Sequence, residues 1–180
     1  MGKKAKTGGT VDEGTGNMLM TMMTQVEDLD FGGEGENDPK RLLVEGFQVS
    51  RLFAIVDFAL SQADVAEGIL SGMDLISREK AIKAINGTFL IEAVGEGNKV
   101  QQFYVDMKKE GKISLGPGPA KPKPEVVIRV ADRDMIALAT GKITPQVAFM
   151  RGKIKVRGNI MKGLQMQNVM NRETSKLSKL

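Results

Sequence analysis

The side chains that most often carry out covalent or acid–base chemistry are missing from this chain of 180 residues, which contains no cysteine and no histidine. Thiolate nucleophiles, Ser-His-Asp and Cys-His arrangements, disulfides and His- or Cys-ligated zinc are therefore excluded. Carboxylates, lysines, hydroxyl groups and Tyr104 remain, but no motif brings them together. We therefore predict that the protein is not an enzyme and uses no metal or other cofactor.

Flexible apolar side chains are concentrated near the end of the chain. Five of the twelve methionines follow residue 130: Met135, Met150, Met161, Met166 and Met170. Thioether side chains adapt to different shapes, so they suit the wall of a cavity with varied ligands. The segment from Asn159 is apolar on several faces and includes Gly163, which costs about 1 kcal/mol relative to Ala inside a helix. An apolar stripe is more often ordinary core, so a filled core and a hollow one both remain open.

Charge is unevenly distributed along the chain. Residues 1–40 carry a formal charge of −4 and residues 41–180 carry +8, which together give the net +4. Between Met135 and Arg172 there are seven basic residues and no acidic residue. Such a surface raises the question of nucleic acid, but aromatic residues are only 4% and no recognition motif accompanies the basic run. We expect no nucleic-acid partner; an anionic membrane surface or a lipid phosphate fits the pattern better.

The period of the apolar residues predicts the elements that position these side chains. Strands are expected over 88–94, 99–107, 112–115, 126–130 and 153–157. Helices are expected over 47–60, 61–73, 77–85, 132–140 and 145–152, and from 159 onward. Ser50 and Asp132 are the predicted N-caps of the first and fourth of these helices. The fold class is therefore α+β, and residues 41–174 are assigned to one domain.

The first 40 residues read as a mostly disordered acidic tail that contains one short helix. Within 17–31, four apolar residues share helical spacing: Leu19, Met22, Val26 and Leu29. Two interpretations remain open, a transiently helical tail or a helix that closes a cavity mouth or binds a partner.

The last six residues, 175–180, form a predicted targeting tail. They end in Ser178-Lys179-Leu180, a tripeptide that the peroxisomal import receptor reads at a free C-terminus. We therefore expect this receptor as a partner and the peroxisomal matrix as the location, with a cytoplasmic pool also allowed.

One stretch of sequence carries a family resemblance. Residues 131–159 read ADRDMIALATGKITPQVAFMRGKIKVRGN and closely resemble the sterol carrier protein 2 domain. The family pattern "ALMTGK–NPQ–AFF–GKLKI–GN" is matched at 137–142, 144–146, 148–149, 152–156 and 158–159. A weaker likeness extends upstream to about Phe47 and so covers roughly two thirds of the chain. The proline-rich segment 117–124 departs from the plainer loop usual in the family.

This resemblance implies a fold and a function. The expected fold is a five-stranded sheet with helices covering one face and an apolar cavity between them. The expected function is non-enzymatic binding and transfer of a sterol, fatty acid, fatty acyl-CoA or phospholipid in peroxisomes. The alternative is an interaction module that docks peroxisomal β-oxidation enzymes and binds lipid only incidentally.

Candidate site residues follow from the expected inward faces of these elements. The predicted ligand-lining residues are Phe53, Val56, Phe89, Ile91, Phe103, Val105, Ile128, Met135, Leu138, Phe149, Ile154, Leu164 and Met166. Lys153, Lys155 and Arg157 should lie on the outer face of the last strand, because alternate residues of a strand point to opposite faces. Two readings of this basic row remain open, a solvated sheet face or transient contact with an anionic membrane or an acyl-CoA phosphate.

Overall fold

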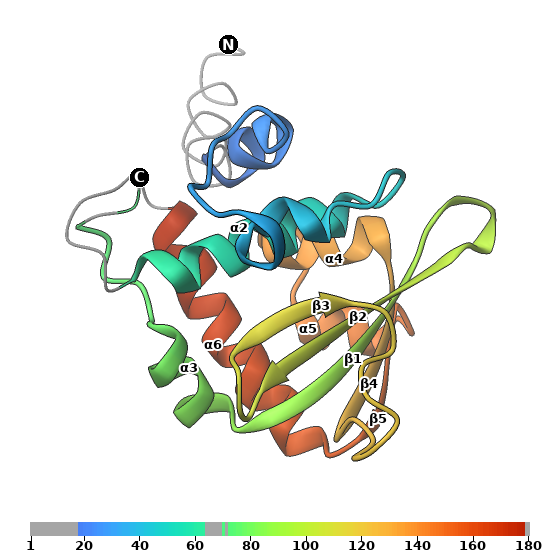
Figure 1. Cartoon of the computed structure of the whole chain (residues 1–180). Coiled ribbons are helices and arrows are strands. Elements are labelled where there is room, and N and C mark those ends of the chain that lie inside the picture. Colours follow the sequence, from blue (N-terminus) through green and yellow to red (C-terminus); the bar gives the residue numbers. More distant parts are fainter. Residues whose placement is uncertain (1–17, 64–69, 71, 179–180) are drawn as a thin grey trace, which may run out of the picture.

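A five-stranded mixed sheet forms one side of the protein, in a computed structural model that describes residues 18–63, 70 and 72–178 (Figure 1). The strands are β1 (Gly87–Val94), β2 (Val100–Met107), β3 (Lys112–Leu115), β4 (Val126–Ala131) and β5 (Ile154–Gly158). Their order is β3-β2-β1-β4-β5. Only β1 and β4 run parallel, and the other neighbours are antiparallel. The predicted α+β class and five strands are confirmed.

The proline-rich segment makes the crossover from β3 to β4. It lies against the outer face of the sheet, because a Cβ atom at Gly118 would overlap the ring of Tyr104. Gly118 also has a φ of +75°, which a residue with a side chain rarely adopts. The crossover therefore covers part of the sheet face that carries no helix.

The inner face of the sheet forms the centre of the core. Cross-strand partners share a face, and Ile91 lies opposite both Phe103 and Ile128. The helices of this face are α2 (Gln48–Gln62), α3 (Arg78–Ile85), α4 (Asp132–Ala139), α5 (Pro145–Met150) and α6 (Ile160–Ser178). Helix α2 packs its apolar side on the sheet, where the Phe53 and Phe103 rings lie 4.8 Å apart between centroids.

The N-terminus of α2 differs from the prediction. Ser50 was the predicted N-cap, but α2 begins at Gln48, and the Ser50 hydroxyl donates to the Phe47 carbonyl at 2.6 Å. The cap comes instead from Asp132, whose carboxylate accepts the backbone N–H groups of Gln48 at 2.9 Å and Val49 at 2.7 Å. The prediction that Asp132 caps its own helix was also wrong, because α4 begins at Asp132 with Ala131 as its N-cap. Sequence spacing does not reveal a cap supplied from 83 residues away.

A buried carboxylate ties α2 to its neighbours. Asp57 is 3% exposed and lies 2.8 Å from the Arg41 guanidinium and 3.4 Å from that of Arg78. Arg41 also donates to the Ile113 carbonyl at 2.7 Å, and Arg78 to the Gly111 carbonyl. A buried carboxylate needs such partners, so this cluster holds α2, α3 and the β3 region together.

The segment before α2 forms an additional layer. Residues 18–25 are helical and lie beside α2 on the side away from the sheet (Figure 1). Leu19, Met23 and Val26 are fully buried there, and the Phe31 and Phe58 rings are 4.8 Å apart. The expectation of a mostly disordered tail over 1–40 differs from this structure for residues 18–40. Residues 1–17, and most of the predicted helical addition at 61–73, lie outside the described residues.

Candidate functional site: an apolar pocket under the last helix

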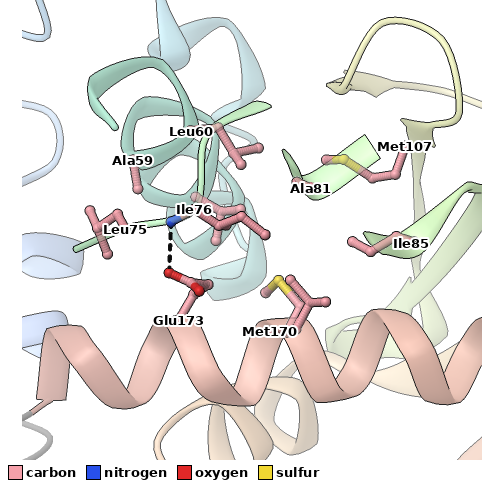
Figure 2. A pocket seen from close by; sticks show the side chains of 11 residues that line it. Ala59, Leu60, Leu75, Ile76, Ala81, Ile85, Met107, Met170 and Glu173 are labelled. Carbon is pink, nitrogen blue, oxygen red and sulfur yellow. Dashed lines mark hydrogen bonds between the residues drawn. The ribbon is translucent and has the colours of Figure 1, made fainter. Parts of the chain in front are cut away.

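An apolar pocket lies where α2, α3, β2 and α6 meet (Figure 2). Its lining residues are Val56, Ala59, Leu60, Leu75, Ile76, Ala81, Ile85, Met107, Val169, Met170 and Glu173. Their positions follow from helical spacing: Val56, Ala59 and Leu60 share one face of α2, and Val169, Met170 and Glu173 share one face of α6. The pocket is thus a space between helices at one end of the sheet.

Glu173, the one charged residue of the pocket lining, makes polar contacts with a neighbouring segment. The Glu173 carboxylate accepts the backbone N–H of Ile76 at 2.9 Å, as the dashed line in Figure 2 shows. Glu173 is also 3.0 Å from the Lys176 ammonium, and Lys176 donates to the Asp74 carbonyl. We call these contacts of Glu173 and Lys176 with residues 74–76 the α6 latch. They fasten the last turns of α6 to the segment between α2 and α3.

The lining of the pocket is almost entirely apolar. All its side chains except Glu173 are aliphatic or thioether groups. Within the described residues, no group of three or more His, Cys, Asp or Glu could hold a metal ion. Such walls stabilise an apolar ligand by removing its surface from water. None of the described helices is long and apolar enough to cross a bilayer.

The size of the pocket bears on how a ligand could enter. Its cavity volume is ≈ 50 Å³, well below the roughly 300–1,000 Å³ of most ligand sites. A lipid chain could enter only if the helices move apart or side chains rearrange. Met107 and Met170 line the pocket, and their flexible side chains can change rotamer more easily than branched ones.

The predicted ligand-lining residues divide into three groups by exposure. Phe53, Phe89, Ile91, Phe103 and Val105 are fully buried in the core. Val56, Ile128, Met135, Ile154 and Met166 are partly buried and pack against it, and Leu138 is half-buried. Phe149 and Leu164 are exposed, at 61% and 47%. Only Val56 of the thirteen lines the pocket, and ligand contact stays a prediction for all of them.

Most of the pocket residues had no distinctive signal in the sequence. Ala59 and Ile85 lie on helices that were predicted, but their apolar stripes do not reveal which helix they face. Met170 belongs to the methionine-rich segment, which was the one available hint. Leu75 and Ile76 lie in a connecting segment without apolar period. Only the tertiary structure therefore shows that α2, α3 and α6 meet around one pocket.

Lys155 and Arg157 of the predicted basic row lie on the outer face of β5, whereas Lys153 precedes the strand, and the row is partly neutralised. Lys153 lies 3.3 Å from the Asp134 carboxylate on α4. Arg157 lies 3.7 Å from Glu92, which is also 3.9 Å from Arg129. Lys155 is exposed and has no ion pair among the described residues. Contact of this row with a head group or membrane stays a prediction.

A second pocket, of ≈ 400 Å³, lies on the outer face of the sheet under the proline-rich crossover. Its lining mixes charged and polar side chains, with Tyr104 on the sheet. Burial and the nearby Asp106 carboxylate raise the pKa of Tyr104 above its usual value. Next to it, a hydrogen bond from Lys108 lowers the pKa of Glu125. The lining of this second pocket is more polar than that of the pocket under α6.

The targeting tripeptide is only partly covered by the structure. Helix α6 ends at Ser178, and Lys179 and Leu180 lie outside the described residues. Import through this tripeptide therefore stays a prediction.

Comparisons with known proteins agree with this architecture. The model of the SCP-2 sterol transfer family matches residues 70–171. The chain is 34% identical over 126 residues to the oleate-induced peroxisomal protein of Candida maltosa, covering 70% of this chain and 89% of that protein. It is 34% identical over 135 residues to sterol carrier protein 2 of Bos taurus, covering 74% of this chain but only 22% of that protein.

A comparison with a solved structure also agrees with this architecture. Sterol carrier protein 2 of Yarrowia lipolytica, in its apo form, superposes with a TM-score of 0.60 at 25% identity, covering 74% of this chain and 97% of the other. The family model spans β1 to β5, the helices between them and the pocket residues from Leu75 to Met170. The chain belongs to the SCP-2 sterol transfer family.

Proposed function

We propose that this protein binds and transfers lipid in the peroxisome without catalysing a reaction. The ligand classes are those expected from the sequence: sterol, fatty acid, fatty acyl-CoA or phospholipid. The observation that carries the proposal is the apolar pocket under α6 in a chain of a sterol transfer family. The peroxisomal part is supported by the C-terminal tripeptide and by the name of the Candida maltosa relative.

Apolar burial should dominate the affinity. Each buried methylene contributes about 0.8 kcal/mol, so a chain of about sixteen carbons has on the order of 12 kcal/mol available. An exposed ion pair contributes roughly 0–1 kcal/mol. Part of the apolar gain offsets the rearrangement that is needed to enlarge a pocket of only ≈ 50 Å³. The pocket wall therefore sets affinity, and charged residues tune head-group preference.

Opening would proceed through α6. This helix forms one wall of the pocket, and the α6 latch fastens its end to residues 74–76. A moving helix would break the Glu173–Ile76 hydrogen bond and the Lys176–Asp74 contact before the sheet is disturbed. The core side chains on the sheet, such as Phe89 and Phe103, do not line the pocket and would stay in place.

The first experiment identifies the ligand and tests the pocket. Native mass spectrometry of gently purified protein detects retained lipid, and titration with fluorescent fatty acid, acyl-CoA and sterol measures uptake. Ala59→Phe places a ring in the pocket. It should lower the affinity about 5- to 150-fold, because overfilling a packed site costs about 1–3 kcal/mol.

Ala84→Phe is the matched control. Ala84 is exposed on α3 and does not line the pocket, so this variant should bind as the wild type does. Equal binding by Ala59→Phe and wild type would place the ligand elsewhere. A protein that is empty, takes up no probe and co-purifies with β-oxidation enzymes would support the interaction-module alternative.

The test of peroxisomal import needs a specific design, because the Ser-Lys-Leu tripeptide occurs twice near the end of the chain. Removing residues 178–180 would leave Ser175-Lys176-Leu177 at the new C-terminus, a second copy of the same signal. Loss of import should therefore be tested with Leu180→Asp and with deletion of 175–180, in a fusion to a fluorescent protein at the N-terminus. Peroxisomal localisation of both variants would contradict the targeting role.

A further inference from the structure

The tip formed by residues 142–151 exposes two large apolar side chains. Phe149 and Met150, at the end of α5, are 61% and 84% exposed. The other six phenylalanines of the chain are all buried, with at most 9% exposure. Within α5 only Ala148 is buried and anchors the helix. We call residues 142–151 the α5 tip.

The charge around the α5 tip has one sign. Lys142 and Arg151 are exposed and form no ion pair with any described residue. No acidic residue occurs between Met135 and Arg172. Asp134, just before this stretch, is only 13% exposed and is 3.3 Å from Lys153. The tip therefore presents apolar side chains between uncompensated positive charges.

A second cluster of exposed apolar side chains is not flanked by unpaired positive charges. Ile160, Met161 and Leu164 are exposed at the start of α6. The ammonium of Lys162 beside them lies 3.7 Å from Glu125 and donates to the Asn86 carbonyl. Of these two exposed apolar groups, the α5 tip is the one whose neighbouring positive charges form no ion pair with a described residue.

We propose that the α5 tip is a membrane-docking site that inserts Phe149 and Met150 into the interface of an anionic bilayer. Lys142 and Arg151 would contact the lipid head groups, in the arrangement by which peripheral proteins bind such surfaces. The proposal rests on the proposed lipid-transfer function, since a carrier must meet a membrane to load or unload. It assigns the contact to the α5 tip rather than to Lys153 and Arg157, whose charges are already paired.

Vesicle binding tests the docking site directly. Full-length protein without added ligand is sedimented with phosphatidylcholine vesicles, with and without phosphatidylserine. Wild-type protein should bind the anionic vesicles and dissociate as salt rises. Lys142→Gln and Arg151→Gln should each weaken binding about fivefold, since each positive charge near the surface contributes about 1 kcal/mol. Met150→Glu should weaken it by roughly tenfold or more.

Matched controls separate docking from folding and from ligand uptake. Met20→Glu changes an exposed methionine on the acidic N-terminal layer, and Lys80→Glu changes an exposed lysine on α3. Both should bind vesicles as wild type does. Met150→Glu should keep wild-type uptake of fluorescent lipid in solution, so failure of the carrier function would show separately as absent uptake by wild type.

Three results would overturn the docking site. The first is equal vesicle binding by wild type and Met150→Glu, and the second is no preference of wild type for anionic vesicles. The third is a wild-type dimer that Met150→Glu converts to a monomer, which would assign the tip to contact between two copies of the chain.

Discussion

Individual carboxylates in this protein hold segments of the chain together. Glu125 precedes β4 and accepts hydrogen bonds from the backbone N–H of Thr88 at 3.2 Å and from Lys108 at 2.9 Å. Lys162 of α6 lies 3.7 Å away. One side chain therefore connects the starts of β1 and β4 with the hairpin after β2 and with α6.

Glu125 should make stability depend on acid pH. The Lys108 hydrogen bond lowers the pKa of Glu125 below 4.5, so the unfolded chain takes up this proton at a higher pH than the folded one. The resulting stability is present above pH 4.5 and is lost as pH falls through the lower folded pKa. Glu125→Gln should be less stable at pH 7 by about 1–2 kcal/mol. Its stability should also fall less than that of wild type on acidification.

Urea denaturation of both proteins at neutral and acidic pH measures this difference. Glu79→Gln is a suitable control, because the Glu79–Lys83 pair on α3 is highly exposed. If the difference in free energy of unfolding between wild type and Glu125→Gln were constant across the acid range, the proposed pH dependence through Glu125 would be refuted.

At the scale of elements, α2 and α4 are joined end to end by a single side chain. Asp132 begins α4 and caps α2, where it accepts two N–H groups that no carbonyl of α2 can reach. The negative charge also lies at the positive end of the α2 dipole. The position of α2 over the sheet thus depends on the start of α4.

Removing the Asp132 carboxylate should loosen the first turn of α2. We expect Asp132→Ala to lower the free energy of unfolding by about 1–2 kcal/mol and to speed hydrogen exchange at Gln48 and Val49. Asp132→Asn keeps a side-chain oxygen as acceptor and should therefore lose less stability than Asp132→Ala. Slow exchange at these two amides in Asp132→Ala would mean that the cap contributes little.

At the scale of the whole molecule, the chain builds three layers: the sheet, the helices on its inner face, and the N-terminal segment outside α2 (Figure 1). None of the residues 18–44 lines the pocket, which lies among α2, α3 and α6. The position of this segment therefore supports a stabilising layer rather than a lid over the pocket.

Deletion of residues 1–38 should lower stability but leave lipid affinity close to that of wild type. Leu19, Met23 and Val26 would be lost, and burying each such side chain contributes about 1.5–3 kcal/mol. Thermal denaturation and lipid titration of the truncated protein measure the two quantities. A smaller change, Phe31→Ala, removes only the ring beside Phe58 and keeps the test possible if the deletion variant does not fold.

A large loss of lipid affinity in folded Phe31→Ala would contradict this separation and support the lid interpretation. Unchanged stability of the deletion variant would instead mean that the N-terminal layer contributes no net packing.

The local pattern of the sequence determined which elements form. The strand predicted at 112–115 matches β3, and the other four differ from the observed strands by one residue at one or both ends, because alternation of apolar residues is visible within each strand. The resemblance over residues 131–159 identified the family, since it rests on residue types in fixed order. The absence of Cys and His also removed whole classes of chemistry without any structure.

The tertiary structure alone decided which residues meet. It brought Asp132 to the N-terminus of α2, packed Leu19 and Phe31 against the outer side of α2, and placed Ala59, Ile85 and Met170 around one pocket. It also left Phe149 exposed, where the apolar pattern had suggested a cavity wall. Periodicity shows that an apolar side chain must pack against another surface, but it does not show which helix or strand provides that surface. That choice depends on how the whole chain buries its apolar area and pairs its charges at the same time.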